Sequence, residues 1–273
     1  YTPRLADRLG APRPRSSPIG QREMNIAKSC QARFEEVAAH CFRRLHDLVP
    51  TPRLALAGGC ALNGVMNARI HRDTPFQECY LQSAASDDGT CLGAAYYCWH
   101  HVLGQAKRFH MSHACWGPEH SEERLRAVAG SSGFAVAQYE AGPLLEAVAD
   151  ALMEGKIVGW YQGRSEWGPR ALGNRSILAN PCLPHMKDTI NAKIKRRESF
   201  RPFAPSVLKE LVGEYFEQNL ESPFMMHVVP IRAEWRGRLP AITHVDGTGR
   251  LQSVARESNP RYYDLIEAFR RAH

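Results

Sequence analysis

The sequence predicts an α/β fold organised in two parts. Segments with strand-like and helix-like patterns alternate over residues 54–102 and again over 121–161, and such alternation is typical of α/β proteins. An irregular stretch, 104–120, separates the two blocks. A basic loop rich in glycine and proline follows the last of these strands, which is where ligand-binding loops of α/β sheets usually lie.

The composition is that of a globular protein that prefers anionic partners. Hydrophobic residues make up 44% of the chain and charged residues 23%, and the formal net charge is +7. This charge does not distinguish nucleic acid from a nucleotide or an acyl phosphate. The eight cysteines form no Cys-x-x-Cys pair, which argues against a zinc site and a disulfide framework. We therefore expect a protein of the reducing cytoplasm. No apolar run approaches the roughly 20 residues of a membrane helix, so we expect no membrane partner.

The first block opens with a loop and a long helix. Residues 1–23 are rich in proline, arginine and glycine and are expected to form a loop. Apolar residues recur at helical spacing over 25–48, which predicts an amphipathic helix. A strand expected over 54–57 runs into the glycine pair 58–59 and a second helical pattern that ends near Ile70. Such paired glycines either present backbone N–H groups to a nucleotide or make a tight turn.

Acidic and histidine-rich segments follow in the same block. A strand over 79–82 precedes the pair Asp87-Asp88, which either binds a metal or a ribose or caps the helix expected over 91–102. The irregular stretch contains His110, His113, Cys115 and His120. Because no strand or helix would hold these side chains in a metal site, we interpret the stretch as an interdomain linker.

The second block continues the alternation. Its expected elements are a helix over 121–129, a strand over 134–139, a helix over 143–153, a strand over 156–161, a helix over 209–216, a strand over 224–230, a turn over 245–249, a strand over 250–254 and a helix from Pro260.

The basic loop, residues 163–206, indicates function most clearly. Arginines and lysines gather among its glycines and prolines, and few acids offset them. Glycine lets an anion approach the backbone closely, and arginine binds phosphate or carboxylate through two parallel hydrogen bonds. Because the charges neither mix in sign nor repeat at helical spacing, we interpret the loop as a phosphate-handling site.

Four stretches taken together resemble a known family. They read LALAGGCALNGVMNARI over 54–70, GRSEWGPRALGNRSILANP over 163–181, KIKRRESFRPFAPSVL over 193–208 and THVDGTGRLQSV over 243–254. In this order they are similar to the O-carbamoyltransferases of the nodulation-factor and antibiotic-tailoring family. The resemblance covers nearly the whole chain.

The resemblance implies two domains and two reaction steps. Residues 1–105 would be the C-terminal part of an actin-like, sugar-kinase-like ATPase domain, 106–120 a linker, and 121–273 a YrdC-like α/β domain truncated at its C-terminus. In such enzymes the YrdC-like domain converts carbamoyl phosphate and ATP to carbamoyl-adenylate. The actin-like domain then passes the carbamoyl group to a hydroxyl of a small molecule such as a sugar. An iron-type divalent metal assists this transfer, and magnesium accompanies ATP.

The resemblance also implies roles for individual residues. Those that match the family's positions are Lys195, Arg201 and Arg170 as catalytic residues, Arg250, Met225, Gly168 and Arg175 as substrate-binding residues, Gly58, Gly59 and Asn63 as nucleotide-binding residues, and Asp87 as a metal ligand.

Other readings of single residues stay open. Arg196 and Arg197 are consecutive at a helix end and are expected to be solvated rather than catalytic. Arg175 either binds substrate or holds the loop through backbone carbonyls. Glu166 either pairs with a local arginine or acts as an acid, and His244 is a weaker candidate for assisting catalysis.

The chain begins at Tyr1 without a methionine and stops at His273 inside a helical pattern, so we expect a fragment that cannot complete carbamoyl transfer alone. Two alternatives are a threonylcarbamoyl-type tRNA-modifying enzyme and a nucleic-acid-binding module that uses the basic run 187–201. The RSEWGPRALGNRS stretch favours the small-molecule carbamoyltransferase. Aromatic residues in the basic run adjoin prolines, whereas nucleic-acid surfaces interleave them with cations.

Overall fold

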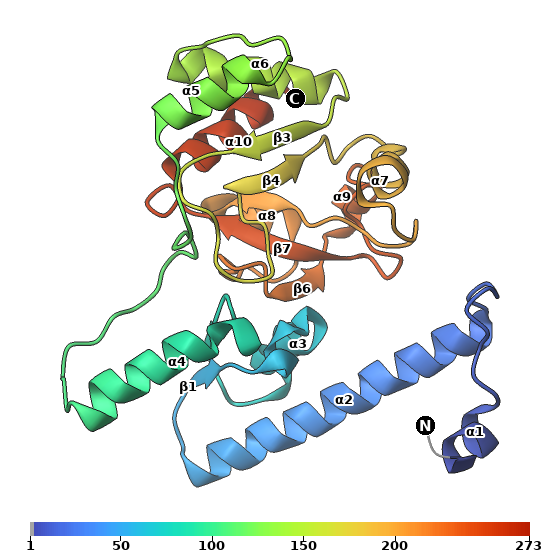
Figure 1. Ribbon diagram of the computed structural model, residues 1–273. Coiled ribbons are helices and arrows are strands. Elements are labelled where there is room, and N and C mark those ends of the chain that lie inside the picture. The colour runs from blue at the N-terminus through green and yellow to red at the C-terminus, as the bar shows by residue number, and fades with distance from the viewer. Residues whose placement is uncertain (1–2) are drawn as a thin grey trace. The chain divides into compact units, whose positions relative to one another are not determined.

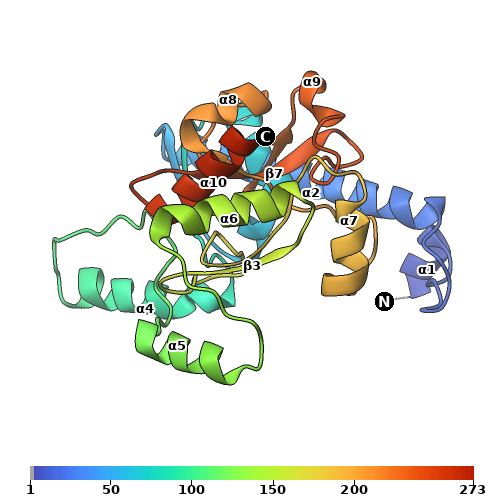
Figure 2. The ribbon, with the colours of Figure 1, turned by 90° about the horizontal axis from the view of Figure 1, so that it is seen from above.

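The computed structural model describes residues 3–273, which form two compact units (Figures 1 and 2). The first unit comprises the chain up to Leu54 together with 69–78, and the second comprises 55–68 and 79–273. Residues 106–120, which the sequence predicts to be a linker, lie within the second unit. Within residues 3–273, every helix is too short or too polar to traverse a bilayer.

The first unit contains two helices, α1 (Pro3–Leu9) and α2 (Gln21–Leu48). Helix α1 corrects the prediction that 1–23 is all loop, at least for its described residues. Helix α2 confirms the predicted amphipathic helix, and Glu23 begins it by accepting a hydrogen bond from the Gly20 amide at 3.0 Å. Most of α2 is exposed to solvent, including two of its expected apolar positions, Val37 and Leu45.

The chain crosses between the units in a short sheet and a helix. Strand β1 (Arg53–Leu56) pairs with β2 (Glu78–Leu81), and a turn of 3₁₀ helix over Gly59–Leu62 leads into α3 (Gly64–Asp73). Gly58 has a φ of +98°, a conformation that favours glycine, and its amide donates to the Ala85 carbonyl at 2.6 Å. The expected strands and the glycine turn are thus confirmed.

Helical segments then lead to the C-terminal part of the second unit. They are the 3₁₀ turn Asp87–Gly89, helix α4 (Thr90–Tyr97) and a π-helical turn over Cys98–Val102. Helix α5 (Glu122–Ser131) begins at Ser121, whose hydroxyl accepts from the Arg124 amide at 3.3 Å. The predicted strand over 134–139 is wrong. Its alternating side chains find no partner strand, and Phe134 is 81% exposed.

Two small sheets carry the C-terminal part. In the first, β3 (Val158–Tyr161) pairs antiparallel with β4 (Arg175–Leu178), and Tyr161 lies opposite Arg175. The second sheet has the order β5-β7-β6, built from β5 (Ser206–Leu208), β6 (His227–Pro230) and β7 (Thr248–Val254). Strand β7 is parallel to β5 and antiparallel to β6. The fold is therefore mixed α/β, with strands divided among small sheets.

Helices cover these sheets. The remaining helical segments are α6 (Ala141–Met153), α7 (Met186–Thr189), a π-helical turn over Ile190–Lys195, the 3₁₀ turn Lys209–Leu211, α8 (Val212–Tyr215), α9 (Ala233–Arg236) and α10 (Pro260–Ala272). Helices α6 and α10 lie side by side, and both adjoin the strands (Figures 1 and 2). Asn259 accepts a hydrogen bond from the Tyr262 amide and so begins α10, with Pro260 in the first turn.

One buried cluster joins the early and late parts of the second unit. Its members are Ala61, Leu81, Ala85, Ala114, Leu172, Phe224, Met225 and Met226. The buried side chain of Asn67 strengthens the junction, because its amide donates to the carbonyls of Ala61 and Met226 at 2.7 and 2.8 Å. The two candidate ligand-binding regions described next therefore belong to one packed structure.

Candidate functional site

The loop between β3 and β4 is organised by a single carboxylate. Oε1 of Glu166 accepts hydrogen bonds from the backbone amides of Leu172, Asn174 and Arg175 at 2.7, 2.8 and 3.2 Å. Neither role considered for Glu166 from the sequence is observed, because it contacts backbone amides and not an arginine side chain. It fixes the path of the loop that carries Arg170.

Arg175 braces the same loop from the other side. Its guanidinium donates to the carbonyls of Gln162 and Gly163 at 2.6 and 2.9 Å and lies 3.5 Å from the centroid of the Tyr161 ring. These contacts favour the loop-holding alternative over substrate binding for Arg175. The residue does not line the cavity described below.

Two glycines let the loop approach its neighbours closely. A Cβ on Gly168, whose φ is +122°, would lie 2.7 Å from the Ser83 carbonyl oxygen. A Cβ on Gly173, whose φ is +107°, would lie 2.3 Å from the Tyr262 ring. Gly168 is therefore required for packing against Ser83, and it too lies outside the cavity.

A cavity of about 460 Å³, called the arginine cavity here, lies beside this loop. Its four basic lining residues are Arg170, Lys195, Arg197 and Arg250, and none of its lining residues is acidic. Apolar side chains from α10 and the 177–190 segment line another part of it, among them Leu178, Met186, Ile190, Leu265 and Phe269. Such a cavity suits an anion that carries an apolar or aromatic group.

Two of these arginines are half-buried, and each has a buried nitrogen without a hydrogen-bond partner. The Nε atoms of Arg170 and Arg250 are buried and make no hydrogen bond within residues 3–273. Burial, together with the positive charges of Arg170 and Arg197, lowers the pKa of Arg250 to about 10. Burial also lowers the pKa of Arg170. Cations in such surroundings are stabilised by an anion that supplies the missing acceptors.

Arg197 was expected to be solvated, and the structure corrects this expectation. Its Nε donates to Oδ1 of Asn191 at 2.7 Å, and its guanidinium lies 4.8 Å from the centroid of the Phe203 ring. The π-helical turn over Ile190–Lys195 ends at Arg196, whose left-handed φ of +46° reverses the chain. Lys195 and Arg197, on either side of this turn, both line the arginine cavity.

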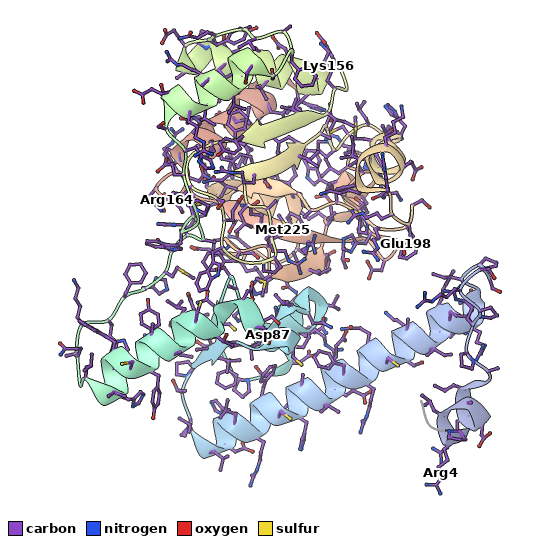
Figure 3. All side chains as sticks on the ribbon, in the orientation of Figure 1. Arg4, Asp87, Lys156, Arg164, Glu198 and Met225 are labelled. Carbon is purple, nitrogen blue, oxygen red and sulfur yellow. The ribbon has the colours of Figure 1, made fainter. Side chains whose placement is uncertain are left out.

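Met225 and Ser206 also line the arginine cavity. Met225 is buried and has a φ of +57°, which is unusual for a residue with a side chain and is found most often at functional sites. Figure 3 shows it in the interior of the C-terminal part. Ser206 accepts a hydrogen bond from the Tyr262 hydroxyl at 2.9 Å and donates to Gln252 at 2.7 Å. Sequence reasoning missed Ser206, although it follows the Phe-Ala-Pro run of a motif that it did identify.

A second cavity of about 610 Å³, called the glycine cavity here, lies beside the early part of the second unit. Gly58, Gly59 and Asp87 line it together, although Asp87 is more than 25 residues away in the chain. Asn63 does not line this cavity. Its Oδ1 accepts a hydrogen bond from the Met66 amide at 3.1 Å in the first turn of α3.

Comparisons with known proteins assign the chain to a family. The profile described as Carbamoyltransferase N-terminus matches residues 3–96, and the profile described as Carbamoyltransferase C-terminus matches residues 149–273. The chain belongs to the carbamoyltransferase family. The resemblance seen in the sequence motifs is thus confirmed.

Individual relatives of this family cover nearly the whole chain. Nodulation protein NolO of Bradyrhizobium diazoefficiens is 40% identical over 95% of the chain, which corresponds to 48% of the relative. The 3'-hydroxymethylcephem-O-carbamoyltransferase of Streptomyces clavuligerus is 34% identical over 86% of the chain and 42% of the relative. The uncharacterized protein sll1178 of Synechocystis is 42% identical over 97% of the chain and 48% of the relative. The chain spans less than half the length of each.

This carbamoyltransferase chain brings together some of the residues implied by the family and not others. Arg170, Lys195, Met225 and Arg250 line the arginine cavity, and Gly58, Gly59 and Asp87 line the glycine cavity. Arg201 is exposed, forms an ion pair with Glu198 and does not line the arginine cavity. His244 also lies outside it. Its Nδ1 faces the Thr248 hydroxyl at 3.0 Å, and burial lowers its pKa.

The predicted linker is hydrogen-bonded to the loop between β3 and β4. The Gly117 amide donates to the Ser165 carbonyl at 2.9 Å, and the Ser165 amide donates to the Pro118 carbonyl at 3.1 Å. Cys115 accepts a weak hydrogen bond from the side-chain amide of Asn174 at 3.2 Å, and burial raises its pKa to about 11. Within residues 3–273, no three His, Cys, Asp or Glu side chains are grouped so as to hold a metal.

Proposed function

We propose that this chain contains the carbamoyl-activating site of an ATP-dependent O-carbamoyltransferase, and that the arginine cavity is this site. The observation that carries the proposal is the pair of half-buried arginines, Arg170 and Arg250, whose buried Nε atoms have no acceptor, in a cavity without any acidic lining residue. The phosphate oxygens of carbamoyl phosphate and ATP can accept hydrogen bonds from both arginines. The YrdC-like character of residues 121–273 is part of the proposal.

The chemistry requires charge stabilisation more than covalent help from the protein. The carbamoyl group exchanges its phosphate for adenylate, which consumes one water and releases phosphate and pyrophosphate. Arg170 and Arg250 would bind phosphoryl oxygens deep in the cavity, while Lys195 and Arg197 would bind the departing phosphate groups nearer solvent. The apolar lining formed by residues such as Ile190 would contact the nucleobase.

The second step would transfer the carbamoyl group to a hydroxyl of a small molecule at the glycine cavity. The Gly58-Gly59 turn supports nucleotide binding there, as part of an actin-like domain. An iron-type metal does not fit the described residues, because Asp87 is one carboxylate and a transition metal needs several ligands. We therefore assign no step to this metal, and magnesium enters only as the ion that accompanies ATP.

Pyrophosphate release tests the first step. The protein expressed from its complete reading frame would be incubated with ATP alone, carbamoyl phosphate alone, or both. We expect release only with both substrates, and we expect Lys195→Ala to abolish it. Lys193→Ala is the matched control, because Lys193 is exposed on the same π-helical turn but does not line the cavity.

The controls separate function from folding. Each variant would be compared with the wild type by thermal denaturation. Normal release by Lys195→Ala, or no release by the folded wild-type protein, would contradict the proposed activity. Binding of tRNA would then be measured to test the threonylcarbamoyl alternative.

A further inference from the structure

An exposed ion pair lies next to the arginine cavity. The Nε atom of Arg201 is 2.8 Å from Oε2 of Glu198, and the two side chains are 52% and 50% exposed. The neighbouring Arg197 lines the cavity, and its pKa is lowered by burial and by the positive charge of Arg201, whereas the negative charge of Glu198 acts in the opposite direction. Arg201 is therefore close enough to the cavity to act electrically on one of its cations while being held by a carboxylate outside it.

The backbone of this segment is fixed although the ion pair is exposed. Asn191 is buried, and its side-chain amide donates to the Arg201 carbonyl at 2.7 Å. The Oδ1 atom of the same asparagine accepts from Arg197 at 2.7 Å. One side chain thus ties the backbone of Arg201 to a cavity residue. The backbone at Arg201 is thus held in place while its side chain is exposed.

We propose that Glu198 is a positioning residue that holds Arg201 beside the empty cavity and releases it to the phosphate groups of a bound substrate. This inference rests on the proposed function of the cavity. Figure 3 shows Glu198 on a surface loop, which agrees with its exposure. An exposed ion pair is weak because water screens it, whereas a guanidinium bonded to phosphate in a poorly solvated cavity makes strong charge-assisted bonds. The exchange is therefore favourable.

Glu198 also has a purpose in the free protein. The arginine cavity already holds four cations without an acid, and an unpaired Arg201 would add a fifth beside Arg197. The carboxylate neutralises this charge until an anion arrives. It therefore competes with the substrate for Arg201, and its removal should tighten binding.

The test measures the affinity of the 273-residue chain for inorganic pyrophosphate and for ATP by titration calorimetry. We expect Glu198→Gln to bind both about 2- to 5-fold more tightly, which is the worth of an exposed pair. We expect Arg201→Gln to bind about 10-fold more weakly. In the Arg201→Gln background, Glu198→Gln should have no further effect. This dependence on Arg201 distinguishes positioning from a general structural role.

Glu217→Gln is the matched control. Glu217 also forms an exposed ion pair, with Arg236 at 3.1 Å, but lies outside the lining of the arginine cavity. We expect it to bind pyrophosphate like the wild type. An equal gain in Glu217→Gln, or a gain from Glu198→Gln that survives in the Arg201→Gln background, would overturn the inference by showing a general charge effect.

The two proposals fail in different ways. Unchanged or weaker binding by Glu198→Gln, together with loss of binding in Arg250→Met, would overturn the role of Glu198 and leave the anion cavity intact. No binding of pyrophosphate or ATP by the folded wild-type chain would overturn both.

Discussion

Arg250 shows how a single residue can trade stability for binding. Arg250 is half-buried, its buried Nε has no acceptor in residues 3–273, and the charges that act on it, those of Arg170 and Arg197, are also positive. Burial of a cation without a partner destabilises the folded state. An anion that enters the cavity supplies the missing partner. Binding therefore removes the destabilisation, and this gain in free energy adds to the affinity for the ligand.

Arg250→Met should make the free protein more stable and deprive it of its ligand response. We expect the free energy of unfolding to rise by about 1–2 kcal/mol without anion, because an apolar side chain replaces an unpaired cation. Pyrophosphate should raise the melting temperature of the wild type but not of the variant. Arg232→Met is the control, since its Nε donates to the Gly213 carbonyl at 2.8 Å, and this variant should be less stable. A less stable Arg250→Met protein would contradict the argument.

The pKa of Arg250 predicts a pH dependence at the alkaline end. The folded-state pKa of about 10 lies below the ordinary value of an arginine, so the destabilising charge is fully present below about pH 10. It is lost as the pH rises above about 10, where the folded protein releases its proton before the unfolded chain does. Pyrophosphate should therefore stabilise the wild type at pH 8 and progressively less above pH 10. Melting temperatures with and without pyrophosphate measure this, and a constant shift across that range would contradict it.

The loop between β3 and β4 acts as an element that presents Arg170. Glu166 collects three of its backbone amides, and Arg175 collects carbonyls on its other side. Glu166, considered from the sequence as an acid, and Arg175, considered as a substrate-binding residue, therefore shape the loop. Their effect on binding is indirect, through the position of Arg170.

Glu166→Gln should weaken the loop and the cavity together. A neutral amide makes weaker bonds to backbone amides than a carboxylate does, so we expect a loss of about 2 kcal/mol in stability. We also expect several-fold weaker binding of pyrophosphate, measured by calorimetry. Glu119→Gln is the control, because its contact with Arg164 is exposed and long at 3.9 Å. Lost stability with unchanged affinity would show that Arg170 does not depend on this loop.

Elements with a clear apolar pattern could be predicted from the sequence, and those without one could not. Helices α2, α6 and α10 and strands β3 and β7 follow their patterns closely. Strand β4 is as short as β3, but it begins with arginine and serine and has no apolar run to mark it. The segment 134–139 has the alternating pattern of a strand. A strand also needs a partner strand, and the sequence alone could not show that this segment lacks one.

The site was predictable as a region and not as a set of side chains. The basic loop and the motifs around Arg170 and Arg250 indicated phosphate binding before the fold was known. Arg197, and not Arg201 as the resemblance implied, lines the arginine cavity. Arg196, just before Arg197, has a left-handed conformation, and nothing in the sequence marks a non-glycine residue for it. The direction that the chain takes after Arg196 therefore could not be predicted from the sequence.

At the scale of the whole molecule, compactness and sequence motifs divide the chain differently. The motifs place a boundary at 106–120, whereas the compact second unit includes residues on both sides of it. Ser83 contacts Gly168, and Gly117 bonds to Ser165, so residues before position 120 directly contact the loop between β3 and β4. The family assignment to separate N-terminal and C-terminal profiles therefore does not mean separate folding within this unit.

The shared apolar cluster limits how this protein can diversify. Ala61 and Leu81 adjoin the glycine cavity region, Phe224 and Met226 flank the Met225 wall of the arginine cavity, and all four are buried together. Recombination at 106–120 would separate Ala61 and Leu81 from Phe224 and Met226, although all four pack in one buried cluster. A chain that acquires a new N-terminal segment therefore keeps the Met225 wall of the arginine cavity only if the new segment packs against the same cluster. Chimeras joined before Ala61 or after Met226 leave the cluster whole.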